Sequence, residues 1–200
     1  MGTFKDSQEV DQVIGGFFRE AVKVPKGDAA LIGEYMGLLT KDHALAEKFF
    51  YIMTDEDKKE TRRYLEILKS GDPETIKQAE AGILKSGKFI EETLQGAQMI
   101  LRFNLKDPDL SVVIDATEDP IGVYINDPAR KPSADFTLKA DVANKFWNGK
   151  VNLALALTKK DIVARGPIPK ILKLVKILGT MYGFYKLYIT KIGRTDLVIE

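Results

Sequence analysis

The sequence predicts an α+β fold, in which a five-stranded, mainly antiparallel sheet is covered on one face by helices and is joined by an N-terminal helical insertion. Three observations predict it. Apolar residues recur every three or four positions as far as about residue 96, which is the spacing of amphipathic helices. From Ala97 they recur at every second position, as in strands, and from Pro169 helical spacing returns. The 200 residues, 44% of them apolar, suffice for one packed core with an elaboration.

The chain opens with a predicted amphipathic helix that ends near Pro25. Asp6 or Ser7 can cap its first turn, because a short oxygen-bearing side chain accepts a free backbone N–H there. Its apolar stripe consists of Val10, Ile14, Phe17, Phe18 and Val22.

Further helices are predicted between residues 29 and 96. Helical spacing runs from 29 to 49, and Gly33, Gly37 and Thr40 within that stretch indicate two helices. The stretch Thr54–Asp57 has the pattern of a capping box and predicts the start of another helix. Gly71 predicts the end of that helix, and Pro73 predicts the start of the next one.

Four strands are predicted over 97–105, 110–117, 121–125 and 134–140, and the first two form a hairpin. Each has one apolar face, so we expect an antiparallel sheet that is wet on one side and covered by helices on the other. Asp141 is expected to cap a short helix that Gly149 ends. A fifth strand is predicted over 161–166. Pro169 then begins the last helix, which Gly179 and Gly183 are expected to kink or interrupt.

Residues that could support catalysis are scarce. The chain has no cysteine, which excludes disulfides, thiolate nucleophiles and thiolate zinc sites. Its one histidine, His43, lies beside Asp42 and near Glu47; an acid–base pair or partial metal site is conceivable there, but a surface histidine is the simpler interpretation. Nucleophile-elbow, phosphate-loop and dinucleotide-glycine motifs are absent. Asp115, Glu118 and Asp119 surround turns, which aspartate stabilises without a catalytic role. We therefore expect no catalytic residue, metal or cofactor.

Charge is distributed unevenly along the chain. Residues 139–194 hold 12 basic and 2 acidic residues, a net +10, while the remaining 18 basic and 27 acidic residues give −9. The basic part predicts transient contact with an anionic membrane or with the phosphates of a coenzyme-A thioester, against the alternative of a solvated lysine face. Nucleic acid is not expected as a partner, because the nearby Tyr182, Tyr185 and Tyr188 lie in an apolar helical stretch and are predicted to fill core. The start of the chain lacks an apolar signal core and no stretch approaches a membrane span, so a cytoplasmic location is expected.

Three motifs carry a resemblance to a known family. They are Ala140–Lys150 (ADVANKFWNGK), Ala164–Pro167 (ARGP) and Lys170–Leu174 (KILKL). Together they resemble the sterol-carrier-protein family of nonspecific lipid-transfer domains, in its short prokaryotic form. The similarity covers Ala97 to about Arg194 and Phe4 to Val22. It implies a short helix over 151–157, where the alternating pattern alone favours a strand and the Ala and Leu content favours a helix.

The resemblance implies an apolar tunnel between sheet and helices that accepts a fatty acyl chain, acyl-CoA, isoprenoid or sterol-like lipid without catalysis. It assigns residues 1–24 and 97–200 to the lipid-binding domain. Residues 25–96 become a helical insertion that lids the pocket, fills it or mediates a homodimer. The implied pocket wall consists of Phe146, Trp147, Leu153, Leu155, Ile171, Leu174, Val175, Leu178, Met181 and Phe184.

Three other interpretations stay open on the residues alone. The same apolar positions would build a solid core without a tunnel, because filled and hollow interiors need the same side chains. The chain would also suit a dimerising interaction module that serves an enzyme of lipid or isoprenoid metabolism. The third is an enzyme that uses Asp, Lys or Tyr on a lipid-like or thioester substrate.

Overall fold

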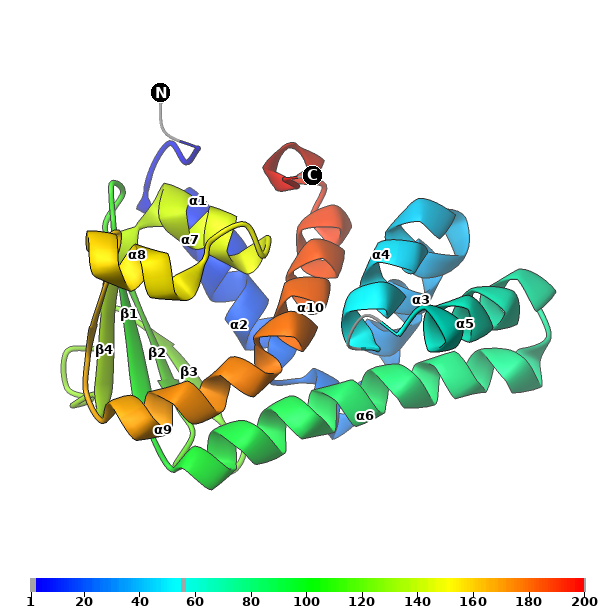
Figure 1. Ribbon diagram of the computed structural model, residues 1–200, viewed down its shortest axis with the longest axis horizontal. Helices are drawn as coiled ribbons and strands as arrows, with labels where there is room; N and C mark the ends of the chain where they lie inside the picture. The colour runs from blue at the N-terminus through cyan, green and yellow to red at the C-terminus, as the bar shows by residue number, and fades with distance from the viewer. Residues whose placement is uncertain (1–2, 55–56, 200) are drawn as a thin grey trace.

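The computed structural model describes residues 3–54 and 57–199 and places a sheet at one end of an elongated molecule (Figure 1). Helix α10, Leu178–Lys191, lies between the sheet part and a group formed by α3, Ala29–Lys41, α4, His43–Met53, and α5, Lys58–Ser70. The long helix α6, Pro73–Ala97, runs along one side of both parts. Buried side chains of both parts belong to one hydrophobic cluster, so the helical region is packed onto the rest of the protein.

The opening helix forms as predicted. It consists of α1, Ser7–Val10, a π-helical turn η1, Asp11–Gly15, and α2, Gly16–Ala21, followed by the short η2, Val24–Lys26. Asp6 caps it by accepting the N–H of Glu9. Gly27, at φ 73°, ends η2, because this left-handed conformation is easiest for glycine.

Two helices occupy residues 29–53, as expected, and the break lies at Asp42, two residues after Thr40 and away from Gly33 and Gly37. The Asp42 side chain accepts the N–H of Leu45 and thereby starts α4. Helix α5 is capped by Asp57 and not by Thr54; the centre of the predicted capping box, residues 55 and 56, lies outside the described residues. As predicted, Gly71 ends α5 and Pro73 begins α6.

The sheet has the order β3-β2-β1-β4-β5. Its strands are β1, Ile100–Lys106, β2, Leu110–Asp115, β3, Gly122–Ile125, β4, Ala134–Lys139, and β5, Ile162–Arg165. Three pairs are antiparallel, which confirms a mainly antiparallel sheet. The prediction that the first four strands are all antiparallel is wrong, because β4 pairs with β1 in parallel, Phe103 opposite Phe136. The connection over residues 126–133 returns the chain so that β4 runs in the direction of β1.

The face expected to be wet is partly covered. Val113 and Asp115, on that face of β2, are buried. The guanidinium of Arg130 lies over the Tyr124 ring and pairs with Asp115, and Arg102, opposite Val113, donates to the Arg130 carbonyl. Burial by itself raises the pKa of the Asp115 carboxyl, but hydrogen bonds from Thr117 and Arg130 outweigh it and leave that pKa lowered. Asp115 and Glu118, which also pairs with Arg130, therefore have structural partners.

After the sheet, helices α7, Ala140–Trp147, and α8, Leu153–Lys159, follow in the predicted places, and Gly149 ends the first at φ 74°. Asp141 does not cap α7; it lies in the first turn and accepts the N–H of Thr3. The helical form of α8 agrees with the resemblance and with its alanine–leucine content, and Asn152 caps it.

The last helical stretch consists of α9, Ile168–Lys173, a 3-10 turn η3, Leu174–Ile177, and then α10, with the short η4, Thr195–Leu197, near the end. The interruption is η3, whereas α10 continues through Gly179 and Gly183; the prediction of a break at these glycines is wrong. Gly183 instead permits close packing, since a Cβ there would lie 3.2 Å from the Phe49 ring. Tyr185 and Tyr188 are buried, as predicted.

Candidate functional site

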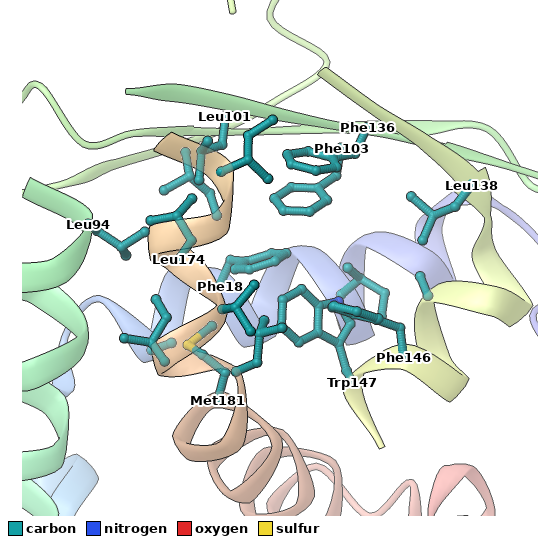
Figure 2. A pocket seen from close by; sticks show the side chains of 18 of the residues that line it. Phe18, Leu94, Leu101, Phe103, Phe136, Leu138, Phe146, Trp147, Leu174 and Met181 are labelled. Carbon is teal, nitrogen blue, oxygen red and sulfur yellow. The ribbon is translucent and has the colours of Figure 1, made fainter. Parts of the chain in front are cut away.

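An apolar cavity of about 100 Å³ lies between the inner face of the sheet and the helices (Figure 2). Strands β1 and β4 form its roof because their apolar residues alternate toward the helices. Leu101 and Phe103 come from β1, and Phe136 and Leu138 come from β4. The rings of Phe103 and Phe136 stack with centroids 5.1 Å apart, and Phe18 of α2 stacks on Phe103 at 5.3 Å.

Helix α7 supplies the aromatic side of the cavity. Phe146 and Trp147 are consecutive, and their rings meet edge to face with centroids 4.8 Å apart. Trp147 also meets the Phe18 ring edge-on at 5.2 Å, which ties α7 to the opening helix. Aromatic pairs of this geometry add about 0.5–1.5 kcal/mol each beyond the area they bury, so they stabilise the packing of this wall.

The opposite wall is less firmly packed. It consists of Ile171 of α9, Leu174 and Val175 of η3, and Leu178 and Met181 of α10. No residue of α9 is buried, and Val175 lines the cavity although 43% of its surface is exposed. The cavity therefore lies directly beneath the molecular surface at η3.

Eight of the ten predicted wall residues line this cavity: Phe146, Trp147, Leu153, Ile171, Leu174, Val175, Leu178 and Met181. The other two lie away from it. Leu155 is 51% exposed on α8, because Ala156, and not Leu155, faces inward there. Phe184 is buried on another side of α10, against Tyr35 and Phe49.

Sequence reasoning left out the rest of the wall. Ile14 and Phe18 of the opening helix and Ile90 and Leu94 of α6 face the cavity together with the strand residues. Their helical spacing and strand alternation identify them as inward-facing, but no sequence pattern shows which inward positions border empty space.

Among the described residues that line the cavity, none has an ionisable side chain, and the indole N–H of Trp147 is the one N–H or O–H group that their side chains carry. Tyr182 lies behind Phe146 and Trp147, and burial raises the pKa of its hydroxyl. His43 is exposed on α4, which confirms a surface histidine. Within residues 3–54 and 57–199 no group of three or more His, Cys, Asp or Glu is placed to hold a metal, and no helix there is both long and apolar enough to cross a bilayer.

These properties fit the hydrocarbon part of a ligand and little else. A polar group in the cavity would lose its hydrogen bonds to water and gain almost none, at a cost of about 2–7 kcal/mol. Left empty, a void of about 100 Å³ costs roughly 2.4 kcal/mol at the ~24 cal/mol per Å³ measured for core cavities. An alkyl chain removes that cost.

Several solved structures are similar to part of this chain. The sterol carrier protein domain 2 of Helicoverpa armigera is 22% identical, with a TM-score of 0.42, covering 50% of this chain and 88% of its own. The apo form of sterol carrier protein 2 from Yarrowia lipolytica is 23% identical at a TM-score of 0.39, with 46% and 76% covered. The UbiJ-SCP2 ubiquinone synthesis protein is 16% identical at 0.37, with 45% and 74% covered. No curated protein matches the chain.

The family model of the SCP-2 sterol transfer family matches residues 80–179, which is half of the chain. The match begins in α6 and runs through the sheet to the start of α10, so it contains the cavity's strands, its aromatic wall and its α9–η3 wall. This chain belongs to the SCP-2 sterol transfer family.

Proposed function

We propose that the protein binds the apolar tail of a lipid, such as an acyl, isoprenoid or sterol-like group, in this cavity and transfers or presents it without catalysing a reaction on it. The observation that carries the proposal is the uniformly apolar lining. It offers no acid, base, nucleophile or metal ligand to a substrate, whereas each methylene that enters gains about 0.8 kcal/mol.

The size of the cavity limits how a lipid is held. Small-molecule sites usually measure about 300–1,000 Å³, so a cavity of about 100 Å³ holds only part of a tail. A longer tail requires one wall to move outward. We expect the wall formed by α9 and η3 to move, because α9 buries none of its residues.

The head group would stay outside. With no polar partner in the lining, a carboxylate or phosphate keeps its hydration only at the surface, and Val175 marks where the cavity comes nearest to it. Recognition would then depend on tail length and shape, which gives weak selectivity among lipids.

We also propose that the insertion, residues 25–96, closes one side of the cavity and does not fill it. Of the described residues of the insertion, those that reach the lining, Ile90 and Leu94, belong to its last helix, α6. Helices α3–α5 lie beyond α10 on the side away from the sheet (Figure 1).

Trp147 gives a direct test, because it is the one tryptophan of the chain and it lines the cavity. Stearic acid that carries bromine on its tail quenches tryptophan fluorescence on contact. We expect saturable quenching at one ligand per protein, reversed by unlabelled stearic acid, and stearic acid without bromine should quench far less. Native mass spectrometry with organic extraction would identify any co-purified lipid. Absence of quenching together with a lipid-free extract would refute the proposal.

A further inference from the structure

The segment α9–η3, Ile168–Ile177, exposes an apolar stripe on the outside of the cavity wall. Ile168, Leu172 and Val175 are 50%, 59% and 43% exposed. They are spaced four and three residues apart and therefore share one face of a helix. Exposed single apolar residues are common, but three on one short segment form a continuous stripe.

Lysines flank this stripe. Lys170, Lys173 and Lys176 are exposed, and the segment contains no acidic residue. Residues 159–176 hold six basic residues and one acidic residue, for a net charge of +5. In the part of the chain that the structure describes, none of these three lysines forms a salt bridge with another side chain. Their charge is therefore free to act on an external anionic surface.

The same segment is a wall of the cavity. Ile171 and Leu174 line the cavity. The segment is therefore apolar both on the side that faces the cavity and on the adjoining exposed face. Val175 borders the cavity and also an open groove of about 720 Å³ that it shares with Phe89 of α6. The segment thus borders open space on both sides, and none of the residues of α9 is buried.

We infer that α9–η3 is a docking surface for an anionic lipid bilayer, through which the lipid tail passes between membrane and cavity. The inference deepens the proposed function and rests on it. The stripe enters the boundary between head groups and acyl chains, while the lysines contact anionic head groups, which is how interfacial amphipathic helices bind. When the stripe enters the bilayer, lipid replaces the water around its side chains. The least tightly packed wall of the cavity then lies against the hydrocarbon from which the tail comes.

The test is flotation of the full chain with two kinds of vesicle. One is phosphatidylcholine alone, and the other is equal parts phosphatidylcholine and phosphatidylglycerol. We expect binding to the anionic vesicles that weakens with added salt, since surface charge is screened. Triple reversal Lys170→Glu, Lys173→Glu and Lys176→Glu should lower the partition coefficient about a hundredfold or more, and Ile168→Ser with Leu172→Ser about tenfold or more.

A matched control reverses three exposed lysines elsewhere: Lys58→Glu, Lys59→Glu and Lys69→Glu on α5 change the net charge equally and should leave most of the binding intact. All sites are exposed, so the fold should survive in each variant, which circular dichroism checks. Two results would overturn the inference directly: no binding of the wild-type protein to anionic vesicles, or a loss of vesicle binding in the α5 control equal to that in the triple reversal. A third would assign this face to a second copy of the chain: a wild-type dimer that dissociates in the Ile168→Ser, Leu172→Ser variant and in no other.

Quenching of Trp147 fluorescence by brominated stearic acid, measured in solution without vesicles, separates the carrier function from the membrane docking. A variant that binds the fatty acid normally but not the vesicle isolates the docking step. A wild-type protein that binds vesicles but shows no quenching and yields a lipid-free extract refutes the carrier function and the passage of a tail through α9–η3, while the docking of this segment to the bilayer stands.

Discussion

Replacing Ala143 with leucine tests whether the cavity is the binding site. Ala143 is fully buried in α7 and lines the cavity, and leucine is nearly as good a helix former as alanine. The added carbons bury about three methylenes, worth up to about 2.4 kcal/mol at ~0.8 kcal/mol each. They also fill most of a void of about 100 Å³ whose emptiness costs a similar amount.

After some strain, we expect the free energy of unfolding of Ala143→Leu to rise by about 1–2 kcal/mol, which corresponds to a Tm increase of about 2–8 °C in a chain of this size. Binding should change in the opposite direction. The space for about three ligand methylenes is lost, so affinity for brominated stearic acid should fall about fiftyfold. The assays are urea unfolding and Trp147 quenching.

Ala46→Leu is the matched control, because Ala46 is equally buried in helix α4 but lies away from the cavity. Overfilling a well-packed site costs about 1–3 kcal/mol, so this variant should be less stable and should bind the ligand normally while folded. If Ala143→Leu is destabilised as much as the control and still binds the fatty acid, no empty space lies beside Ala143 and the fatty acid binds elsewhere.

Three further predictions concern the frame around the site. Asp115→Asn should cost about 1–3 kcal/mol at neutral pH, because it weakens the hydrogen bonds that the buried carboxylate accepts from Arg130 and Thr117. The folded-state pKa of Asp115 is lowered, so its contribution to stability is present above about pH 4 and is lost as pH falls further. The difference in urea midpoint between variant and wild type should therefore narrow below that pH, and a constant difference would contradict this. Asn148→Ala should leave the Ile199 N–H unpaired and the Leu197 carbonyl with only the longer hydrogen bond from the Asn144 amide, cost about 1–3 kcal/mol and speed hydrogen exchange near residue 199. Gly87→Ala places a Cβ 2.7 Å from a methyl of Val24 and 3.1 Å from the backbone of η2, and should destabilise the protein by about 1–3 kcal/mol. Gly33→Ala, where the added Cβ meets open space, should stabilise it by up to about 1 kcal/mol. If calorimetry shows that Tm changes in the same direction in both variants, the close packing at Gly87 is refuted.

Most helices and strands were predictable from sequence because their starts, ends and periodicity depend on residues that are neighbours in the chain. Gly71 and Pro73 mark a helix junction through their own backbone limits, and alternation in β1 follows from the pleat. The errors arise where a distant partner decides. Asp141 bonds Thr3 and not its own helix, and α10 runs through Gly183 because Phe49 of α4 packs against that glycine.

The site shows the same division. Eight of the residues that the family resemblance implies as a pocket wall line the cavity, among them Phe146 and Trp147 of the ADVANKFWNGK motif. Leu155 was misplaced because a short alanine–leucine helix has apolar residues on several faces, and only its contact with β5 selects Ala156 as the buried one. The mixed sheet was missed because strand direction depends on the path of the connecting loop.

The sequence by itself determined the fold class, the elements, the absence of cysteine chemistry and the excess of positive charge near the end of the chain, because composition and local spacing fix these directly. Only the tertiary structure decided that the interior is partly hollow, that α9–η3 separates that cavity from the surface, and that Ile168, Leu172 and Val175 stay uncovered. The physical reason is that burial is a property of pairs of surfaces: an apolar side chain shows that it favours a partner, but the arrangement of all elements decides whether another side chain, empty space or solvent lies opposite it.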